Sequence, residues 1–530
     1  MSKAKRNKSS KKKLGQFLTP RKLTKKIVDT HDIKIDDKIL EPSFGNGSFL
    51  FPIIEKLLAI YDCDRATALD HIFDKNIYGV EIDEKVYREF FHTVKEKYNY
   101  TPSKHNLILS DYFDVEFDVE FDHILGNPPF GGVFDKDKED NLDKKYGKRL
   151  GNKIKKETYC FFTVSCVEKL KSEGEMSFIC SDTFLSINTM SGLRNFLLEE
   201  GDVEINPLSY FSEETNYGMV VFKLKKQESE FIKINNNKVE KEKIRLFPNL
   251  SFTDNIEYLK YFNDTLIGDL FVCSSGMTVG KNEFFIREII DNKIAENYDF
   301  TFFNDPISLE KELSKARLNK ISERKKKEIL EKERVNATKR NIKVNKKIKP
   351  EIISLPHPDY CYYNKSSKGQ IYSKPTHVIF WKDEGDAVIT YKKNGNWYLH
   401  GVGGKKFFKK EGFTWSLISD KIKIRFLESG YILDSGAPIG VPKEGTDRKE
   451  NFFIIGWLHT KLATNIMKKV INHTKNIQSK DMEKMPYPHW VSQEQKAIVI
   501  KMVDEQINKM KNGENLESRF SEDLERIFSF

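Results

Sequence analysis

The motif Asn127-Pro128-Pro129-Phe130 combines residue types that can hold a planar amino group. It directly follows an apolar stretch, Phe121 to Gly126, that is expected to form a strand. Two consecutive prolines exclude a helix and hold Asn127 in extended geometry, so its side-chain carbonyl and a proline backbone carbonyl can point at one spot. Two such acceptors direct the lone pair of an exocyclic NH2 group at an electrophile, and Phe130 offers a ring face for stacking a base.

A turn with two glycines follows an earlier expected strand, in the segment Ile39 to Leu50. Gly45 and Gly47 can adopt backbone geometry that other residues resist, and they let the main chain approach a ligand closely. Glu41, at the end of the strand, can meet an ammonium group or a hydroxyl. The spacing is GxG rather than GxGxxG, and by itself such a turn is more often structural than a cofactor loop.

Two more acidic residues stand at expected strand ends. Glu81 ends the stretch Ile77 to Glu81, where a carboxylate can accept two ribose hydroxyls; the alternative is a surface acid that begins a helix. Asp111 follows the strand ending at Ser110 and is followed by Tyr112 and Phe113, which suits the amino group and ring of an adenine. The alternative there is a loop acid beside core aromatics.

The elements that must position these residues alternate between short apolar strands and amphipathic helices. Expected strands are Lys38 to Glu41, Ile77 to Glu81, Asn106 to Ser110, Phe121 to Gly126, Glu175 to Cys180 and Gly218 to Lys223. Expected helices are Gly47 to Ala59, Glu84 to Lys97 and Glu157 to Lys171. This alternation predicts an α/β fold with a doubly wound, mostly parallel sheet, followed by a mixed α/β region.

Composition and charge place the chain among globular proteins that bind a polyanion. The 530 residues are 38% hydrophobic and carry a net charge of +10. Residues 1–13 hold seven Lys/Arg and no acid, and residues 311–350 hold sixteen Lys/Arg against five Glu, so the rest is net acidic. Such runs are also common as solvated tails. Without an apolar run of membrane length, a leader or a CxxC pair, we expect a cytoplasmic, nucleoid-associated protein with no membrane span and no metal site.

In their order along the chain, these motifs resemble the N6-adenine DNA methyltransferases of the gamma arrangement. Leu14 to Pro20 is similar to motif X of that family, Glu41 to Gly47 to motif I, Glu81 to motif II, Asp111 to motif III, and Asn127 to Phe130 to motif IV. The resemblance covers roughly residues 14–226, and more loosely the C-terminal half. Motif I departs from many relatives in starting with Glu41 rather than Asp and in its central Ser43-Phe44.

The resemblance implies S-adenosylmethionine as cofactor and assigns roles to individual residues. The implied catalytic residues are Asn127, Pro128, Pro129 and Phe130. The implied cofactor-binding residues are Gln16, Thr19, Pro20, Glu41, Pro42, Gly45, Gly47, Glu81, Ile82, Asp111, Tyr112 and Asn127. Phe130 and a second aromatic would stack on the target base; Phe211 is preferred for the second position and Tyr217 is the alternative.

The implied function is sequence-specific methylation of adenine N6 in double-stranded DNA, within a restriction-modification or phage-defence system. The implied organisation is a basic tail (1–13), a catalytic domain (14–245) and a target-recognition domain (246–530) with a basic, helical insertion at about 311–349. A monomer is expected, with any endonuclease encoded separately, because motif X begins at residue 14. The alternatives are an RNA or protein-glutamine methyltransferase of the same fold, and a catalytically inactive DNA-binding subunit.

Overall fold

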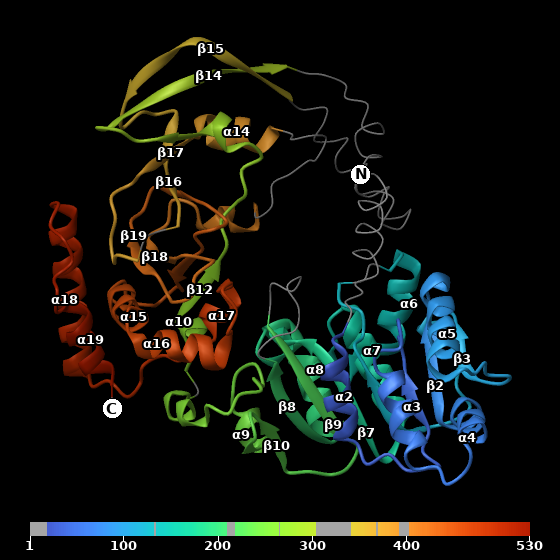
Figure 1. Cartoon of the computed structure of the whole chain (residues 1–530). Coiled ribbons are helices and arrows are strands. Elements are labelled where there is room, and N and C mark those ends of the chain that lie inside the picture. The colour runs from blue at the N-terminus through green and yellow to red at the C-terminus, as the bar shows by residue number, and fades with distance from the viewer. Residues whose placement is uncertain are drawn as a thin grey trace. The chain divides into compact units, whose positions relative to one another are not determined.

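The chain divides into two compact units, Met1–Ile256 and Glu257–Phe530 (Figure 1). The structure is a computed structural model that describes residues 19–131, 134–208, 218–263, 265–303, 341–366, 369–391 and 402–529. Gln16, Phe211, Tyr217 and most of the expected basic insertion lie outside the described residues. Within the described stretches, no helix is long and apolar enough to cross a membrane.

A nine-stranded sheet forms the centre of the first unit, in the order β11-β10-β8-β9-β7-β4-β1-β2-β3. The strands are β1 (Ile39–Glu41), β2 (Ile77–Glu81), β3 (Asn106–Leu109), β4 (Phe121–Gly126), β7 (Leu170–Ser181), β8 (Asp202–Leu208), β9 (Met219–Lys225), β10 (Phe231–Ile234) and β11 (Asn237–Glu240). Five neighbours, from β7 through β4, β1 and β2 to β3, pair in parallel, and β9 runs antiparallel between β7 and β8. The expected doubly wound, mostly parallel α/β sheet is therefore confirmed.

Helices connect the parallel strands, as parallel pairing requires. They are α2 (Arg21–Asp29), α3 (Leu50–Leu58), α4 (Arg65–His71), α5 (Glu84–Tyr98), α6 (Lys136–Tyr146), α7 (Thr158–Lys169), α8 (Ser191–Glu200) and α9 (Lys241–Arg245). Helix α5 shows how local sequence sets the bounds. It begins where the Asp83 carboxylate accepts the backbone amides of Lys85 and Val86, and it ends at Asn99, which adopts a left-handed conformation (φ 49°).

The central strands are buried on both faces, which explains their uninterrupted apolar sequences. Ile39 and Leu40 of β1 and Ile124 and Leu125 of β4 have no exposed surface. A strand covered by helices on both sides has no solvent face, so alternation of apolar and polar residues is lost. Burial of these strands fixes the sheet register, and with it the position of the residues that follow each strand.

The second unit combines small sheets, mostly antiparallel but with β16 and β20 paired in parallel, with helices. One four-stranded sheet has the order β12-β21-β18-β19, another has the order β13-β17-β16-β20, and β14 pairs with β15. The strands are β12 (Phe271–Ser274), β13 (Ile286–Glu288), β14 (Lys293–Phe303), β15 (Asn341–Ser354), β16 (Tyr360–Asn364), β17 (His377–Phe380), β18 (Gly412–Trp415), β19 (Ile424–Leu427), β20 (Tyr431–Leu433) and β21 (Ile439–Pro442). This matches the mixed α/β architecture expected for the C-terminal half.

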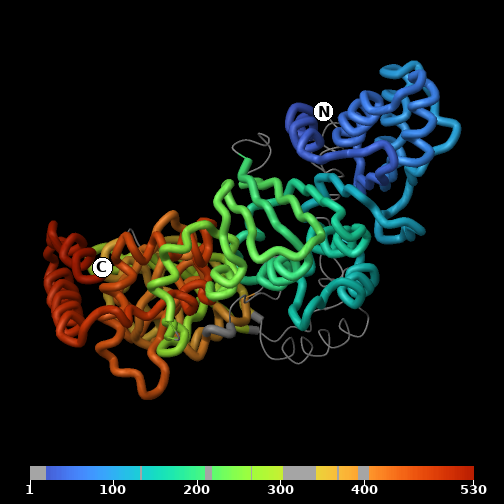
Figure 2. Tube along the Cα trace, turned by 90° about the horizontal axis from the view of Figure 1, so that it is seen from below, coloured from blue at the N-terminus to red at the C-terminus, as the bar shows by residue number. Residues whose placement is uncertain are grey.

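Three helices of the second unit, α16, α18 and α19, contact the apolar helix α15. The helices described in this unit are α10 (Ile267–Leu270), α11 (Asn282–Phe285), α14 (Lys382–Thr390), α15 (Glu450–Leu458), α16 (Lys461–Ile466), α17 (Ser479–Glu483), α18 (Gln493–Lys511) and α19 (Phe520–Phe528). Residues Asn451–Leu458 of α15 are all buried, and α18 and α19 both contact this helix. Figure 2 shows these two C-terminal helices side by side at the red end of the chain.

The expected helix at about 311–349 is wrong in its described part, because Asn341–Lys349 belongs to β15. Lysine-rich composition favoured a helix, but Ile342 and Val344 alternate with polar residues and pack with Phe300 and Phe302 on the partner strand β14. A two-residue period fits a strand with one packed face. Cross-strand packing therefore overrides the helical propensity of the lysines.

Candidate active site

Four polar residues singled out from the sequence follow four adjacent parallel strands. Across the sheet in the order β4, β1, β2 and β3, the strand ends carry Asn127, Glu41, Glu81 and Asp111. Because parallel strands all end at one edge of the sheet, these residues share the carboxyl edge. The crevice outside this edge is where open α/β sheets bind their ligands.

The loop after β1 is held by main-chain bonds and by one buried aromatic. The Phe44 amide donates to the Val80 carbonyl of β2 (3.1 Å), and the Gly47 amide donates to the Phe44 carbonyl (2.8 Å). The Phe44 ring is 1% exposed and packs against Tyr87 and Phe90 of α5, with centroids 5.9 and 5.2 Å away. The unusual Ser43-Phe44 centre of this motif therefore anchors the loop to α5.

Glu41 is a buried acid with an unsatisfied oxygen. The residue is 2% exposed, and its Oε2 has no hydrogen-bond partner among the residues that the structure describes. Burial raises the pKa of Glu41 well above its usual value, and the nearby Glu81 carboxylate adds to this, whereas the backbone amide of Leu50 opposes it. A buried acceptor without a partner is costly in a native protein, so an ammonium group fits this position.

The Glu81 carboxylate is oriented by two backbone amides. Gly45 donates to Oε2 (2.9 Å) and Asp83 donates to Oε1 (2.8 Å). Burial raises the pKa of Glu81, and these two amides partly offset the effect. Each carboxylate oxygen can accept a second bond, so the group can receive hydroxyls while the loop holds it in place. The hydrogen bond from Gly45 also connects the loop after β1 to the end of β2.

Asp111 is engaged by a lysine that the sequence analysis did not single out. Its Oδ1 accepts the amide of Phe113 (3.0 Å), and its Oδ2 lies 2.6 Å from Nζ of Lys138, which also reaches Asp114 at 3.0 Å. Lys138 lies on α6, in the segment that follows the Asn127 motif. The acid therefore remains a possible acceptor for an amino group, but it must share its Oδ2 with this ammonium.

The Tyr112 ring, which the sequence analysis expects to pack on a purine, is largely buried against α7. Tyr112 is 4% exposed, and its ring stacks on Phe162 of α7 with centroids 4.8 Å apart and an interplanar angle of 18°. Its hydroxyl lies 3.1 Å from Oγ of Ser165. The Tyr112 ring, which follows Asp111 in the sequence, therefore forms part of the hydrophobic core. Ile82, directly after Glu81, is 49% exposed and is better placed to contact a ring.

The Asn127 side chain is oriented from the N-terminal segment. Its Nδ2 donates to Oγ1 of Thr19 (3.0 Å), so the acceptor Oδ1 occupies the other end of the amide. Phe130 is 8% exposed and packs against Tyr159 of α7 with centroids 5.7 Å apart. The loop ends where the Gly131 amide donates to Oε1 of Glu157 (3.1 Å). Thr19, predicted as a cofactor residue, is thus brought next to the predicted catalytic residue.

Sequence reasoning missed Lys138 and Glu157, which brace this site. Both lie in segments rich in charged residues, where a single lysine or glutamate gives no signal of its own. The one available sign was position, since each lies within about thirty residues of Asn127 in the connection to the next strand. Pro20 was assigned to the cofactor, and in the structure it is the residue that precedes α2.

The two glycines of the loop after β1 are expected to differ when replaced by alanine. At Gly47 (φ +79°) an added Cβ would lie 2.5 Å from the Phe90 ring, whereas at Gly45 (φ +54°) it would meet nothing within 4 Å. Gly47→Ala therefore combines backbone strain with overpacking and should destabilise the protein by about 2 to 4 kcal/mol, against about 1 kcal/mol for Gly45→Ala. Urea denaturation of both variants checks this order, and equal losses would contradict the packing argument.

Comparison with known proteins gives a family for the first unit. The family described as N-6 DNA Methylase matches residues 4–263. Among curated proteins, the chain is 28% identical over 200 residues to the type II methyltransferase M.HincII of Haemophilus influenzae, covering 37% of this chain and 33% of that protein. It is 35% identical over 118 residues to the type I MjaIX methylase subunit of Methanocaldococcus jannaschii, covering 22% of this chain and 19% of that protein. The matches span about a third or less of these relatives.

Solved structures resemble the fold over nearly the whole chain. A nuclease-deletion mutant of the type ISP restriction-modification enzyme LlaGI, in complex with a DNA substrate mimic, has a TM-score of 0.55 at 13% identity and covers 93% of this chain and 47% of that one. The type IIL restriction-modification enzyme MmeI, in complex with DNA, has a TM-score of 0.54 at 11% identity and covers 96% and 71%. Residues 4–263, which carry the ordered motifs on the carboxyl edge of the sheet, therefore match the N-6 DNA methylase family, and the curated relatives named above are methyltransferases.

Proposed function

We propose that this protein is a sequence-specific DNA methyltransferase that transfers the methyl group of S-adenosylmethionine to the N6 amino group of adenine in duplex DNA. The observation that carries the proposal is the placement of Asn127. It follows β4, directly beside the strand that ends in Glu41, and Thr19 holds its amide. An acceptor for an amino group thus stands next to the acid best suited to an ammonium group of a cofactor.

The acids of the carboxyl edge would hold the cofactor, which supplies a methyl group on a positively charged sulfur. Oε2 of Glu41, which has no partner in the described part of the chain, would accept a hydrogen bond from the cofactor's amino group. The Glu81 carboxylate would accept hydrogen bonds from the ribose hydroxyls. Asp111 would accept the amino group of the adenine ring, beside which the exposed Ile82 would pack. The other residues assigned to the cofactor are Gln16, Thr19, Pro20, Pro42, Gly45, Gly47, Tyr112 and Asn127, and these assignments are part of the proposal.

The Asn127 motif would receive the target adenine after the base has left the DNA stack. Unstacking costs on the order of a few kcal/mol, and it is required because N6 is buried in the duplex. Oδ1 of Asn127 and the Pro128 carbonyl would each accept a hydrogen bond from the adenine amino group, while Phe130 would stack on the ring. The cofactor would supply the methyl group on its positively charged sulfur, and the Asn127 motif would hold the accepting nitrogen, which would release its surplus proton to water. Alignment of the reacting atoms would supply much of the rate.

Recognition of the DNA is assigned to residues 246–530. Strand β15 carries the exposed lysines Lys343, Lys346 and Lys349, and positive charge of this kind binds phosphates through release of counterions. Base contacts in the grooves would then select the sequence. We further propose that the protein acts as a monomer in a restriction-modification or phage-defence system, with a separately encoded endonuclease.

The test is transfer of tritium from labelled S-adenosylmethionine to unmethylated duplex DNA, followed by analysis of the labelled nucleosides. Label in N6-methyladenine is the expected result. Label in a methylated cytosine would overturn the choice of base. Parallel reactions with RNA and with protein test the related amino-group substrates, and label only in those would replace DNA as the substrate. Cofactor binding without any transfer would indicate an inactive DNA-binding subunit.

A further inference from the structure

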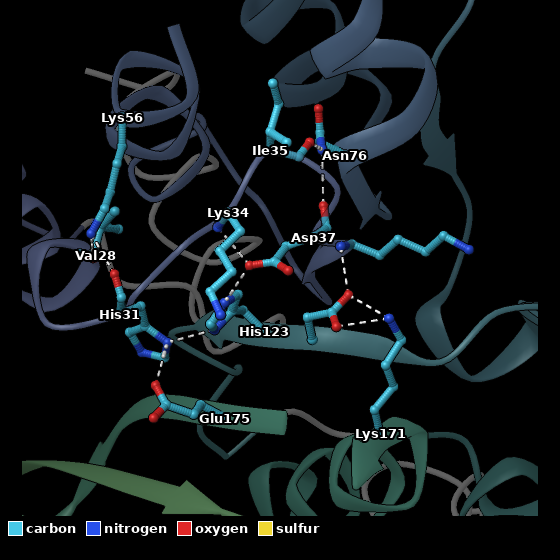
Figure 3. A network of polar contacts seen from close by, with 12 residues as sticks. Val28, His31, Lys34, Ile35, Asp37, Lys56, Asn76, His123, Lys171 and Glu175 are labelled. Atoms are coloured by element: carbon cyan, nitrogen blue, oxygen red, sulfur yellow. Dashed lines mark hydrogen bonds and ion pairs between the residues drawn. The ribbon is translucent and has the colours of Figure 1, made fainter. Parts of the chain in front are cut away.

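A cluster of side chains that can ligate a metal lies at the edge of the nine-stranded sheet opposite the candidate active site. His31 precedes β1, His123 stands near the start of β4, and Glu175 pairs with His123 from strand β7 (Figure 3). His31 is 1% and His123 6% exposed, which is deep burial for two imidazoles. These three residues are far apart in the sequence, so no sequence motif indicates the cluster. The proposed methyl transfer does not involve them.

Both imidazoles turn the same nitrogen toward the centre of the cluster. Nδ1 of His31 lies 3.1 Å from Nδ1 of His123 and 3.4 Å from Oε2 of Glu175. The three potential ligand atoms all lie within 4.8 Å of one another. In a tetrahedral zinc site with zinc–nitrogen distances of about 2.0–2.1 Å, neighbouring ligand atoms are about 3.3 Å apart. The two separations from His31, 3.1 and 3.4 Å, therefore match the spacing of ligands around one small divalent ion.

The outer nitrogens of the two rings are bonded to oxygen acceptors. Nε2 of His123 lies 3.1 Å from Oδ2 of Asp37, and Nε2 of His31 lies 2.7 Å from Oγ of Ser177. Metal-bound histidines usually give their second N–H to a carboxylate or another oxygen, which fixes the tautomer and turns the lone pair toward the ion. Both rings have such a partner, so each can present Nδ1 as an unprotonated ligand.

We propose that His31, His123 and Glu175 form a structural site for a divalent transition-metal ion, represented experimentally by Zn²⁺. Two imidazoles and one carboxylate are ligands that zinc accepts, and water or a fourth protein oxygen would complete the tetrahedron. The carboxylates of Glu175 and Asp37 together balance the charge of one divalent ion. This proposal is independent of the methyl transfer proposed above.

Lys223 would have to leave the cluster when the ion binds. Its ammonium lies 2.7 Å from Oε2 of Glu175, and its side chain is 24% exposed, so a path to solvent exists. Lys56 is not a competitor, because it donates to the backbone carbonyls of Val28 and His31 rather than to a ligand atom (Figure 3). Lys223 thus holds the place of the cation in the metal-free cluster.

A bound ion would fasten the start of the domain to the sheet. His31 follows α2 closely, and α2 in turn follows Thr19, which bonds to Asn127. Coordination would tie the α2–β1 connection to β4 and β7, in addition to the packing of Ile33 in the core and the polar contacts of His31. Zinc binding is therefore expected to raise the thermal unfolding temperature of the full-length protein.

The test measures zinc binding by the full-length protein after treatment with a chelator. Titration calorimetry and elemental analysis should give one Zn²⁺ per chain, and Co²⁺ should give the visible absorption of a tetrahedral site. Glu175→Gln should weaken zinc binding at least tenfold, whereas Lys223→Met should strengthen it by a similar factor. His92→Gln is the matched control, since His92 and Glu96 have the same 3.4 Å separation on an exposed helix face.

Wild-type protein that binds no stoichiometric zinc in this titration would overturn the proposal. So would equal zinc affinities for the wild type and a folded Glu175→Gln variant. The Lys223→Met variant keeps all three ligands, so it tests the site even if a ligand variant fails to fold. Zinc affinity in Lys223→Met no greater than in the wild type would contradict displacement of the lysine.

Discussion

Replacing Asn127 by alanine is expected to lower the rate of adenine methylation by about 10²- to 10³-fold or more, with a smaller effect on cofactor affinity. Groups that are preorganised to hydrogen-bond the reacting atoms have effects of this size in enzymes. The variant loses the acceptor proposed for the adenine amino group, while Glu41, Glu81 and Asp111 are untouched. Single-turnover transfer to duplex DNA measures the chemical step, and calorimetry measures cofactor binding.

Two further variants sharpen this prediction. Thr19→Val keeps the Asn127 amide but removes the hydroxyl that accepts a hydrogen bond from its Nδ2. The methylation rate is therefore expected to fall by only about tenfold, because the Asn127 side chain is less well oriented. Asn206→Ala is the matched control, because the amide of Asn206 donates to Glu204 on β8 and has no part in the proposed reaction. An Asn127→Ala variant as active as Asn206→Ala would remove the basis of the proposed chemistry.

The sheet could be predicted because its strands are short, apolar and bounded by turn residues. The stretches Ile77 to Glu81 and Phe121 to Gly126 have the bounds expected from the sequence, whereas β7 begins earlier than expected, at Leu170. Strands β8, β10 and β11 were not expected. Strands β10 and β11 are only four residues long, and all three strands depend on pairing with their neighbours, which the local sequence does not encode.

The candidate site divides along the same line. Strand ends fix backbone position, so Glu41, Glu81, Asp111 and Asn127 were predicted at or just after strand ends, and the parallel pairing brings them to one edge of the sheet. Side-chain surroundings depend on packing between distant segments. The burial of Tyr112 against α7 and the ion pair between Asp111 and Lys138 both arise from such contacts, and no local pattern signals them.

The second large effect is expected at Glu41, where stability and cofactor binding should change in opposite directions. Burial raises the pKa of this carboxyl, and its Oε2 has no partner among the described residues, so the ionised form destabilises the cofactor-free protein. Glu41→Gln removes that charge with little change in volume. The cofactor-free variant should be more stable than the wild type by about 1 to 3 kcal/mol near pH 8.

The pH dependence follows from the direction of the shift. A carboxyl whose pKa is raised by folding contributes most stability below its unfolded pKa of about 4.3, and this contribution is lost as the pH rises through the folded value. The wild type should lose stability over that range relative to Glu41→Gln, so the gap between them should widen with pH. Urea denaturation at several pH values measures it, with Glu55→Gln, on an exposed face of α3, as control.

Cofactor affinity should move the other way. A charged hydrogen bond is worth about 1.5 to 3 kcal/mol, so loss of the carboxylate that would accept the cofactor ammonium should weaken binding about 10- to 100-fold. The cofactor should also stabilise the wild type more than the variant against unfolding, because the stability added by binding to the native state rises with the logarithm of the affinity. A variant that gains stability yet binds the cofactor as tightly as the wild type would mean that Glu41 is a buried acid without a ligand. A variant that loses both would mean that an unseen partner already satisfies it.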